Sequence, residues 1–244
     1  MFRERLNAVD RTLFDHVEAQ LTLSDRISLL ALHASIADRL GEFVYLEIGS
    51  FKGGSLQALV ADERCRKIVS IDKRVEWQRD DARAQTGVGY PQNSTQEMLD
   101  LLASVPGADM TKLETIELGT DQIDPTALPR ADFCFIDGEH THDAALRDGR
   151  FCRQALGERG FVAFHDYPIV GRAILRFLRE TREARGYLLA DDVFVVEVGV
   201  PTLLSDARVS GRLRGRLLSW RLLNSVRAVP LALGIYRRSR EWLR

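Results

Sequence analysis

The spacing of apolar residues along the chain changes near residue 41. Over the first 40 residues, apolar side chains such as Leu13, Val17 and Leu21 recur at helical spacing, which predicts helices. Ser24 is the expected N-cap of the second helix, because a serine hydroxyl accepts free backbone N–H groups. Gly41 is its expected stop, because glycine readily adopts the left-handed terminal conformation. The pattern predicts an N-terminal helical cover over residues 1–41.

Beyond residue 41, short apolar runs alternate with helical segments. The runs have strand length and are rich in β-branched or aromatic residues. The expected strands are residues 43–48, 67–71, 113–118, 131–136 and 160–164, and the expected helices lie near residues 54–62, 75–84, 94–104, 142–156 and 169–182. This alternation predicts an α/β fold with a doubly wound, Rossmann-like and mostly parallel sheet between two layers of helices.

The end of this pattern predicts two antiparallel strands. Residues 187–190 and 193–198 flank a polar pair, Asp191 and Asp192, which is typical of a C-terminal hairpin. Ser94 and Glu97 have the spacing of a capping box at the start of a helix. The loop before them, residues 85–93, is expected near the carboxyl edge of the sheet, either as a lid over a substrate or as a plain insertion.

Composition narrows the class of protein without revealing its activity. A hydrophobic fraction of 45%, a charged fraction of 28%, 18 Gly and 7 Pro exclude collagen-like, low-complexity and wholly disordered chains. Cys65, Cys134 and Cys152 lack CxxC spacing, which favours a reducing, cytoplasmic setting over a disulfide framework or a four-ligand zinc site. The sequence shows neither the apolar stretch of a secretory signal nor a run of about 18 uncharged apolar residues.

The most informative stretch is EIGSFKGGS at residues 47–55, where a predicted strand turns into a helix. Its glycines allow a sharp bend and close approach of a ligand to the backbone. The spacing is neither GxGxxG nor GxxxxGK[ST], which disfavours a dinucleotide or triphosphate site. Asp72 ends the next predicted strand, where a carboxylate is well placed to accept hydrogen bonds from ribose hydroxyls. Together the loop and the acid favour a ribose-containing ligand over a mere tight turn and helix cap.

EIGSFKGGS followed by VSIDK resembles the first two motifs of class I S-adenosylmethionine-dependent methyltransferases. FIDGEH (135–140) and GFVAFHDY (160–167) resemble the small bacterial branch that includes macrocin-type and other sugar O-methyltransferases. The resemblance covers roughly residues 40–200. It implies S-adenosylmethionine as the cofactor and O-methyl transfer to a hydroxyl of a sugar, glycan or related small molecule. The residues that it implies around the cofactor are Glu47, Gly49, Ser50, Lys52, Gly53 and Ser55 at the methionine, Asp72 at the ribose, Thr120 and Asp121 at the adenine, and Asp137 close by.

A second group of polar residues follows the fourth and fifth predicted strands. Asp137 ends one strand, and His165 and Asp166 end the other, so all three are expected to face one crevice. Two carboxylates and an imidazole can hold a divalent ion, Mg²⁺ or Mn²⁺, that lowers the pKa of a substrate hydroxyl. The alternatives are metal-free general base catalysis by His140 or His165, or simple capping of the next helix by His165 and Asp166.

The family resemblance adds a further candidate base. The sugar O-methyltransferases that the chain resembles usually have two adjacent aspartates where this chain has His165 and Asp166, and a further acid two residues after the position of Asp137. Glu139 fills that last position and is the first candidate for the base. The imidazole of His165 in place of a carboxylate admits a softer ion than Mg²⁺, or no ion, because hard cations prefer oxygen ligands.

Charge is distributed unevenly along the chain. Residues 206–244 carry ten Arg against two acidic residues, whereas the whole chain has a net charge of −1. We therefore divide it into the helical cover, a cofactor-binding domain at residues 42–205 and a basic amphipathic helical tail at 206–244. Leu, Trp and Arg in the tail could lie in the headgroup layer at the inner face of a membrane, or the tail could pack on the domain or on a second copy.

The sequence is compatible with more than one methyl acceptor and with more than one kind of activity. Nucleic acid is not expected as a partner, because the body of the protein is acidic and no reader motif is present. A phenol or carboxylate acceptor is an alternative to the sugar. A non-catalytic protein of the same fold that binds a nucleoside or a protein partner is the alternative to an enzyme.

Overall fold

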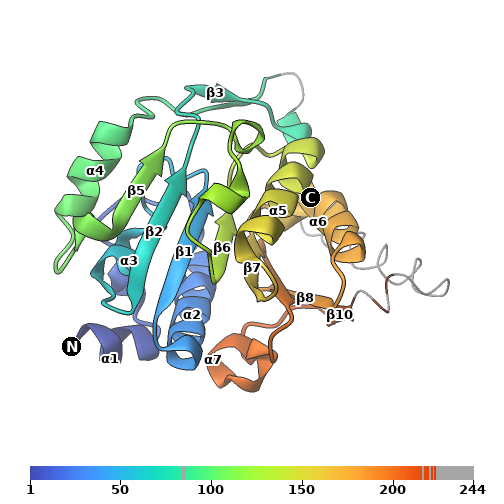
Figure 1. Cartoon of the computed structure of the whole chain (residues 1–244). Coiled ribbons are helices and arrows are strands. Elements are labelled where there is room, and N and C mark those ends of the chain that lie inside the picture. Colours follow the sequence, from blue (N-terminus) through green and yellow to red (C-terminus); the bar gives the residue numbers. More distant parts are fainter. Residues whose placement is uncertain (84–85, 216, 220, 222, 224–244) are drawn as a thin grey trace.

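The computed structural model describes residues 1–83, 86–215, 217–219, 221 and 223, which fold around one large sheet (Figure 1). The strand order is β10-β8-β9-β7-β6-β1-β2-β5. Strands β5, β2, β1, β6 and β7 pair in parallel, whereas β9 is antiparallel to β7 and β8, and β10 is antiparallel to β8. The strands are β1 Phe43–Ile48, β2 Cys65–Ile71, β5 Leu113–Ile116, β6 Phe133–Ile136, β7 Gly160–Phe164, β8 Ala184–Leu189, β9 Val193–Val198 and β10 Leu218–Ser219. The predicted mostly parallel sheet and C-terminal hairpin are confirmed.

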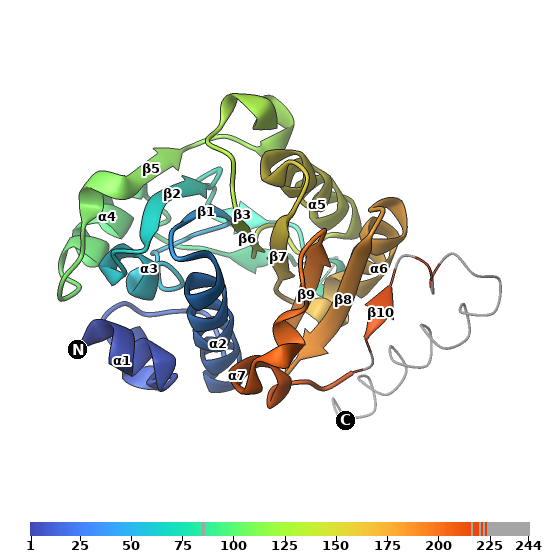
Figure 2. The ribbon, with the colours of Figure 1, turned by 60° about the horizontal axis from the view of Figure 1, so that its bottom comes forward.

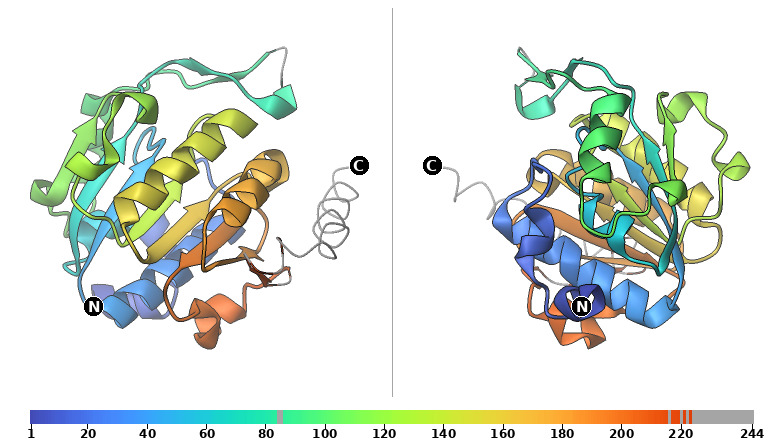
Figure 3. Two further views of the ribbon diagram at one scale, coloured as in Figure 1. Left: turned by 45° about the vertical axis from the view of Figure 1, so that its right-hand side comes forward. Right: turned by 90° about the vertical axis from the view of Figure 1, so that its left-hand side faces the viewer.

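Helices cover both faces of this sheet (Figures 2 and 3). One face packs against α1 (Phe2–Asn7), α2 (Leu23–Leu40), α3 (Gln57–Ala61) and α4 (Thr95–Ala103), and the other against α5 (His142–Leu156) and α6 (Tyr167–Glu180). Alternate residues of each strand point to opposite faces. In β6, Phe133 and Phe135 join the core beside α2, while Cys134 and Ile136 join the core beside α5 and α6.

The helix caps agree with the sequence at two of three positions. Gly41 ends α2 with φ +77°, and Ser94 caps α4 by accepting a hydrogen bond from the Glu97 N–H at 3.1 Å. Ser24 as the cap of α2 was wrong, because Thr22 has the extended backbone of an N-cap and accepts from the Asp25 N–H at 3.2 Å. Ser24 lies inside the first turn, where its hydroxyl accepts a hydrogen bond from Arg212 instead.

The helix predicted at residues 75–84 is also wrong. Arg74 has φ +55° and turns the chain away from the sheet directly after β2. The chain then forms β3 (Trp77–Gln78), which pairs with β4 (Val88–Gly89), with a 3₁₀ turn at Asp81–Arg83 between them. This excursion passes over the carboxyl edge of the sheet (Figure 1). Since most helical stability comes from packing, a segment that exposes 56% of Trp77 has too little apolar contact to hold a helix.

Residues 207–215 and 217–219 pack on the body of the protein. Helix α7 (Ala207–Ser210) contacts α2, where Arg208 forms an ion pair with Asp38 at 2.9 Å. Val209 and Leu218 are buried. Residues 224–244, which carry much of the predicted amphipathic tail, lie outside the described residues. None of the described helices combines the length and apolar character needed to cross a membrane.

Candidate active site

The register of the parallel strands aligns the predicted site residues in one row. Ile48 of β1 is paired with Ile71 of β2 and Ile136 of β6, and Ile136 is paired with Phe164 of β7. The residue after each of these four comes at the carboxyl edge of its strand. In sheet order that row is Asp72, Gly49, Asp137 and His165.

Close contacts between backbones explain the glycines of the loop after β1. Gly49 has φ +85°, and a Cβ atom there would lie 2.2 Å from the Asp137 carbonyl oxygen. A Cβ atom on Gly54 would lie 2.4 Å from the Glu18 carbonyl oxygen. Gln57 fixes this second contact, because its side chain donates to the Val17 and Gly54 carbonyl groups. The loop thus joins the end of β6 to the N-terminal segment.

Asp72 is bonded directly to the glycine loop. Its Oδ2 accepts a hydrogen bond from the Phe51 N–H at 2.9 Å, and its Oδ1 accepts from the Arg74 N–H at 2.8 Å. Asn93 Nδ2 also donates to Oδ1 at 3.4 Å, and Arg74 lies 3.7 Å from Oδ2. A carboxylate has about four acceptor sites, so a ligand would share this carboxylate with the loop or replace its longer contacts. The loop and the acid that the sequence paired for a ribose-containing ligand are neighbours in the structure.

Two adjoining clefts meet at Gly49. The first contains Ser50, Lys52, Ser55 and Asp137 of the predicted cofactor residues. The second contains Asp72 and Thr120. Gly49 lines both. Side chains that the sequence did not single out complete the walls, among them Glu18, Gln20, Phe51 and Tyr90 in the first cleft and Gln78, Arg147 and Asp148 in the second.

Three predicted cofactor residues line neither cleft. Gly53 faces Met98 and Leu102 of α4, and Asp121 is exposed. Glu47 is fully buried beneath the loop and accepts hydrogen bonds from the hydroxyls of Tyr45 and Ser55. Burial raises the pKa of Glu47 to about 8, against these hydrogen bonds, which lower it. Glu47 is therefore a support for the loop, and a protonated one at neutral pH.

Asp137, His140, His165 and Asp166 come together in the first cleft. Asp166 Oδ2 lies 2.9 Å from His140 Nε2 and 3.0 Å from His165 Nδ1. Asp137 Oδ1 lies 3.1 Å from His165 Nδ1 and 3.9 Å from His140 Nε2. Each carboxylate thus faces both imidazoles. We refer to these four residues as the Asp–His cluster.

Charges within the Asp–His cluster set its protonation. Burial by itself lowers the pKa of His140, but hydrogen bonds to Asp137 and Asp166 outweigh it and raise the pKa to about 10. Burial likewise lowers the pKa of His165. The negative charge of Asp137 and the neighbouring carboxylates outweigh burial and hold this pKa well above its usual range. Conversely, both histidines hold the pKa values of Asp137 and Asp166 below their usual range despite burial. Without another cation, the cluster consists of two imidazolium and two carboxylate groups.

Helix capping does not account for Asp166. It precedes α6 at the N-cap position, yet its side chain makes no capping hydrogen bond. Its backbone has φ +54°, in the left-handed region, which costs free energy for a residue other than glycine and is common at functional sites. The side chain is turned instead toward His140 and His165.

Glu139 is not part of the Asp–His cluster. It lines the second cleft, where its Oε1 accepts a hydrogen bond from Thr141 Oγ1 at 3.1 Å and its Oε2 lies 3.8 Å from Lys73 Nζ. Of the three residues proposed for catalysis from the sequence, the structure brings His140 and His165 together, and Glu139 lies on the other side of Gly49.

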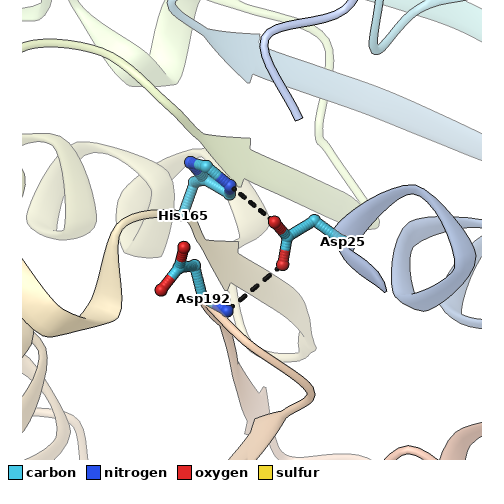
Figure 4. Close-up of side chains that lie close together, drawn as sticks. All are labelled: Asp25, His165 and Asp192. Atoms are coloured by element: carbon cyan, nitrogen blue, oxygen red, sulfur yellow. Dashed lines mark hydrogen bonds and ion pairs between the residues drawn. The ribbon is translucent and has the colours of Figure 1, made fainter. Parts of the chain in front are cut away.

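Two buried carboxylates behind the cluster were missed. Asp25 of α2 is fully buried, and its Oδ2 lies 3.5 Å from His165 Nε2 (Figure 4). Asp25 Oδ1 also accepts from the Asp192 backbone N–H at 3.2 Å. Asp80 of the excursion is 3% exposed, and its Oδ2 lies 3.4 Å from His140 Nδ1. Their distance along the chain from the histidines hid both, and the spacing of Thr22 and Asp25 signals only a helix start.

Comparison with known proteins identifies the family. The family model of a methyltransferase domain matches residues 46–167, half of the chain, from the end of β1 to the start of α6. The chain belongs to this methyltransferase domain family. Its matched segment contains the glycine loop, Asp72 and the whole Asp–His cluster.

Several solved structures with the same fold are O-methyltransferases of low sequence identity. NovP aligns with a TM-score of 0.57 at 14% identity over 81% of this chain and 98% of its own. CalS11, described as a TDP-rhamnose 3'-O-methyltransferase of calicheamicin biosynthesis, aligns with a TM-score of 0.52 at 18% identity over 81% and 94%. The O-methyltransferase from Bacillus cereus in complex with S-adenosylhomocysteine aligns with a TM-score of 0.51 at 14% identity, over 81% of this chain and 90% of its own.

A curated relative, the uncharacterized protein R132 of Acanthamoeba polyphaga mimivirus, is 22% identical over 142 residues. The match covers 56% of this methyltransferase domain protein and 59% of the viral protein. The family and the fold predicted from the sequence are thereby confirmed, and the acceptor stays a proposal.

Proposed function

We propose that the protein transfers the methyl group of S-adenosylmethionine to a hydroxyl of a small molecule that bears a sugar. The observation that carries this proposal is the junction of the two clefts at Gly49. One cleft contains the carboxylate suited to a ribose, and the other contains the Asp–His cluster. A nucleoside that spans Gly49 would present its sulfonium methyl group on the side of the cluster.

The residues around Gly49 suit each part of this cofactor. Asp72 would accept hydrogen bonds from the ribose hydroxyls, and Thr120 lies where the adenine would enter the second cleft. Ser50, Lys52 and Ser55 would surround the methionine part. Carboxylates such as Glu18 and Asp137 in the first cleft favour a ligand with positive sulfonium and ammonium groups.

The Asp–His cluster would receive the acceptor hydroxyl. Methyl transfer from sulfur is an in-line displacement, so alignment of oxygen, methyl and sulfur supplies much of the acceleration. The acceptor must also lose its proton. His140 and His165 are already protonated without another cation, so the proton would go to a carboxylate of the cluster, or would leave with the help of a divalent ion at Asp137, His165 and Asp166. Such an ion, when bound, lowers the pKa of the hydroxyl. The chain's own residues then hold the hydroxyl beside Gly49.

The polar character of the first cleft supports a sugar as the acceptor. Glu18, Gln20 and Tyr90 line it together with the cluster, and such side chains can bond to neighbouring hydroxyls of a sugar ring. One structural neighbour, CalS11, is described as a methyltransferase for the 3'-hydroxyl of TDP-rhamnose.

Binding and activity measurements test the proposal in two steps. Calorimetry should detect one S-adenosylhomocysteine per chain and no comparable binding of NAD or ATP. With labelled S-adenosylmethionine, methyl transfer to a panel of nucleotide-linked sugars and glycan extracts should exceed transfer to phenols and carboxylic acids.

Two variants separate an enzyme from a binding protein. Asp137→Ala should lower transfer by about 100-fold or more, whereas Asp143→Asn, an exposed carboxylate at the start of α5, should leave it unchanged. Strong NAD or ATP binding without S-adenosylhomocysteine binding would reject the proposal. Binding of S-adenosylhomocysteine without transfer to any acceptor would support the alternative of a non-catalytic binding protein.

A further inference from the structure

In the Asp–His cluster, each of two carboxylate oxygens lies close to two imidazole nitrogens, as ligands of one metal ion do. Three of its carboxylate-to-imidazole distances are 2.9 Å, 3.0 Å and 3.1 Å. Two ligands of one ion, each bound at about 2.1 Å, are about 3.0 Å apart at right angles and about 3.4 Å apart in a tetrahedral site. The fourth distance, 3.9 Å between Asp137 and His140, is wider than either spacing but still allows both to reach one ion. One ligand atom each of Asp137, His140 and Asp166 lies within 4.8 Å of the other two, and His165 meets the same criterion with Asp25 and Asp192.

The second ring nitrogen of each histidine provides independent evidence. A histidine that binds a metal usually turns its other ring nitrogen to a carboxylate or carbonyl, which fixes the tautomer and the ring orientation. Here His165 Nε2 faces Asp25 at 3.5 Å and His140 Nδ1 faces Asp80 at 3.4 Å. Both of these carboxylates are buried, at 0% and 3% exposure. Neither lies in the first cleft, so neither is placed to bind an acceptor.

His165 is buried between carboxylates on both sides of its ring. It is only 8% exposed, and its Nε2 atom makes no hydrogen bond within the described structure but lies 3.5 Å from Asp25 Oδ2. Its Nδ1 atom lies 3.1 Å from Asp137 and 3.0 Å from Asp166. The ring is therefore held with Nδ1 on the side of the two carboxylates of the cluster. Figure 4 shows the imidazole of His165 beside Asp25, with Asp192 on the next loop.

The chemistry of the four ligands selects the kind of ion. Mg²⁺ binds oxygen and retains several water molecules, usually on one or two carboxylates. Imidazole suits Zn²⁺, Fe²⁺, Co²⁺ and Ni²⁺. Two imidazoles beside two carboxylates therefore disfavour Mg²⁺.

From these observations we infer that Asp137, His140, His165 and Asp166 bind one first-row transition-metal dication in preference to Mg²⁺, with Asp25 and Asp80 as the positioning residues behind the two histidines. The inference rests on the cluster that the proposed function uses for the acceptor. It assigns His140 as a fourth ligand and gives the N-terminal helix α2, which lies outside the matched family segment, a part in the site.

Metal binding by the full-length chain tests this inference without an activity assay. After treatment with EDTA, the protein is titrated with Co²⁺, Zn²⁺ and Mg²⁺, and binding is followed by calorimetry and by the visible absorption of Co²⁺. We expect one Co²⁺ or Zn²⁺ per chain and a dissociation constant for Mg²⁺ that is about 100-fold higher or more. No metal binding, or Mg²⁺ binding as tight as that of Co²⁺, would overturn the inference.

Variants test the individual assignments. His140→Ala should weaken Co²⁺ binding by about 10-fold or more and change its absorption spectrum. Asp25→Asn and Asp80→Asn should each weaken it by about 10-fold, the usual effect of losing such a carboxylate. Asp143→Asn is the matched control and should bind as the wild type. Unchanged Co²⁺ affinity in His140→Ala would contradict its role as a ligand. Unchanged affinity in both Asp25→Asn and Asp80→Asn would contradict their positioning role.

A separate titration with S-adenosylhomocysteine distinguishes this inference from the proposed function. A chain that binds Co²⁺ as described but does not bind S-adenosylhomocysteine would retain the metal site and lose the proposed function. A chain that binds S-adenosylhomocysteine and transfers methyl groups but takes up no transition metal would retain the function and lose the metal site.

Discussion

Gly49 occupies the point where the two clefts and the strands β1 and β6 meet. Replacing it with Ala would place a Cβ atom 2.2 Å from a backbone carbonyl oxygen at φ +85°. Gly107 is a matched control, with φ +80° and nothing within 4 Å of an added Cβ atom.

We expect Gly107→Ala to lower the free energy of unfolding by about 1 kcal/mol, the cost of the left-handed backbone alone. Gly49→Ala should cost about 3 kcal/mol or more, because backbone must move as well. Urea denaturation of both variants measures the difference. Equal losses would mean that the contact between Gly49 and Asp137 does not constrain the chain.

Glu47 makes stability depend on pH. In the unfolded chain this carboxyl has its ordinary pKa of 4.5, while burial raises the folded value to about 8. Between these values the unfolded state loses its proton first, so the contribution of Glu47 to stability falls as pH rises.

Glu47→Gln removes this titration. Relative to wild type, the free energy of unfolding of the variant should rise by about 1 kcal/mol for each pH unit between pH 5 and 8. Urea denaturation at several pH values provides the comparison. Parallel stability curves for the two proteins would show that Glu47 does not titrate as described.

Residue types and spacing predicted most members of the site, but not their supports. Asp72, Asp137, His165 and Asp166 follow strands directly, so a strand pattern alone brings them to one edge. Asp25 and Asp80 could not be found this way, because Asp25 belongs to a helix start and Asp80 to an excursion. Glu139 was misleading, since its two-residue offset from Asp137 turns it toward Lys73 and the second cleft.

Among the elements, the β3–β4 excursion has the clearest link to the site. Asp81 Oδ2 accepts a hydrogen bond from the His142 N–H at 2.7 Å, at the start of α5, and the Asp81 N–H donates to the His140 carbonyl at 2.9 Å. A carboxylate at a helix N-terminus also interacts favourably with the helix dipole. The excursion is thereby fastened beside His140.

We expect Asp81→Ala to lower the free energy of local opening of the excursion by about 1 kcal/mol. Trypsin should then cut after Arg79 or Arg83 about five-fold faster than in wild type. Glu76→Ala removes an exposed carboxylate from the same excursion and should leave the rate unchanged. Limited proteolysis followed by mass spectrometry measures both. An unaltered cleavage rate in Asp81→Ala would show that other contacts hold the excursion.

The excursion also shows where sequence patterns fail. Its apolar residues allow helical spacing, but Arg74 turns the chain off the sheet, and the helix has no surface to pack on. Where a sheet face was available, as for α4, α5 and α6, the predicted helices formed within a few residues of the expected bounds.

At the scale of the whole molecule, the order of strands brings segments that are far apart in sequence to one edge. The alternation of strands and helices predicted this fold, because parallel strands need helical crossovers and their carboxyl ends share a crevice. It did not predict that the N-terminal segment would reach the same place. Glu18, Gln20 and Asp25 arrive there because Gln57 and the hairpin fix the start of α2 against the sheet.

A crystal structure of the protein with S-adenosylhomocysteine tests the central claim most directly. The ribose should lie against the Asp72 carboxylate, the adenine in the cleft of Thr120, and the sulfur beside Gly49 with its open side toward Asp137 and Asp166. Density for the nucleoside elsewhere, or a sulfur that points away from the Asp–His cluster, would contradict the proposed methyl transfer.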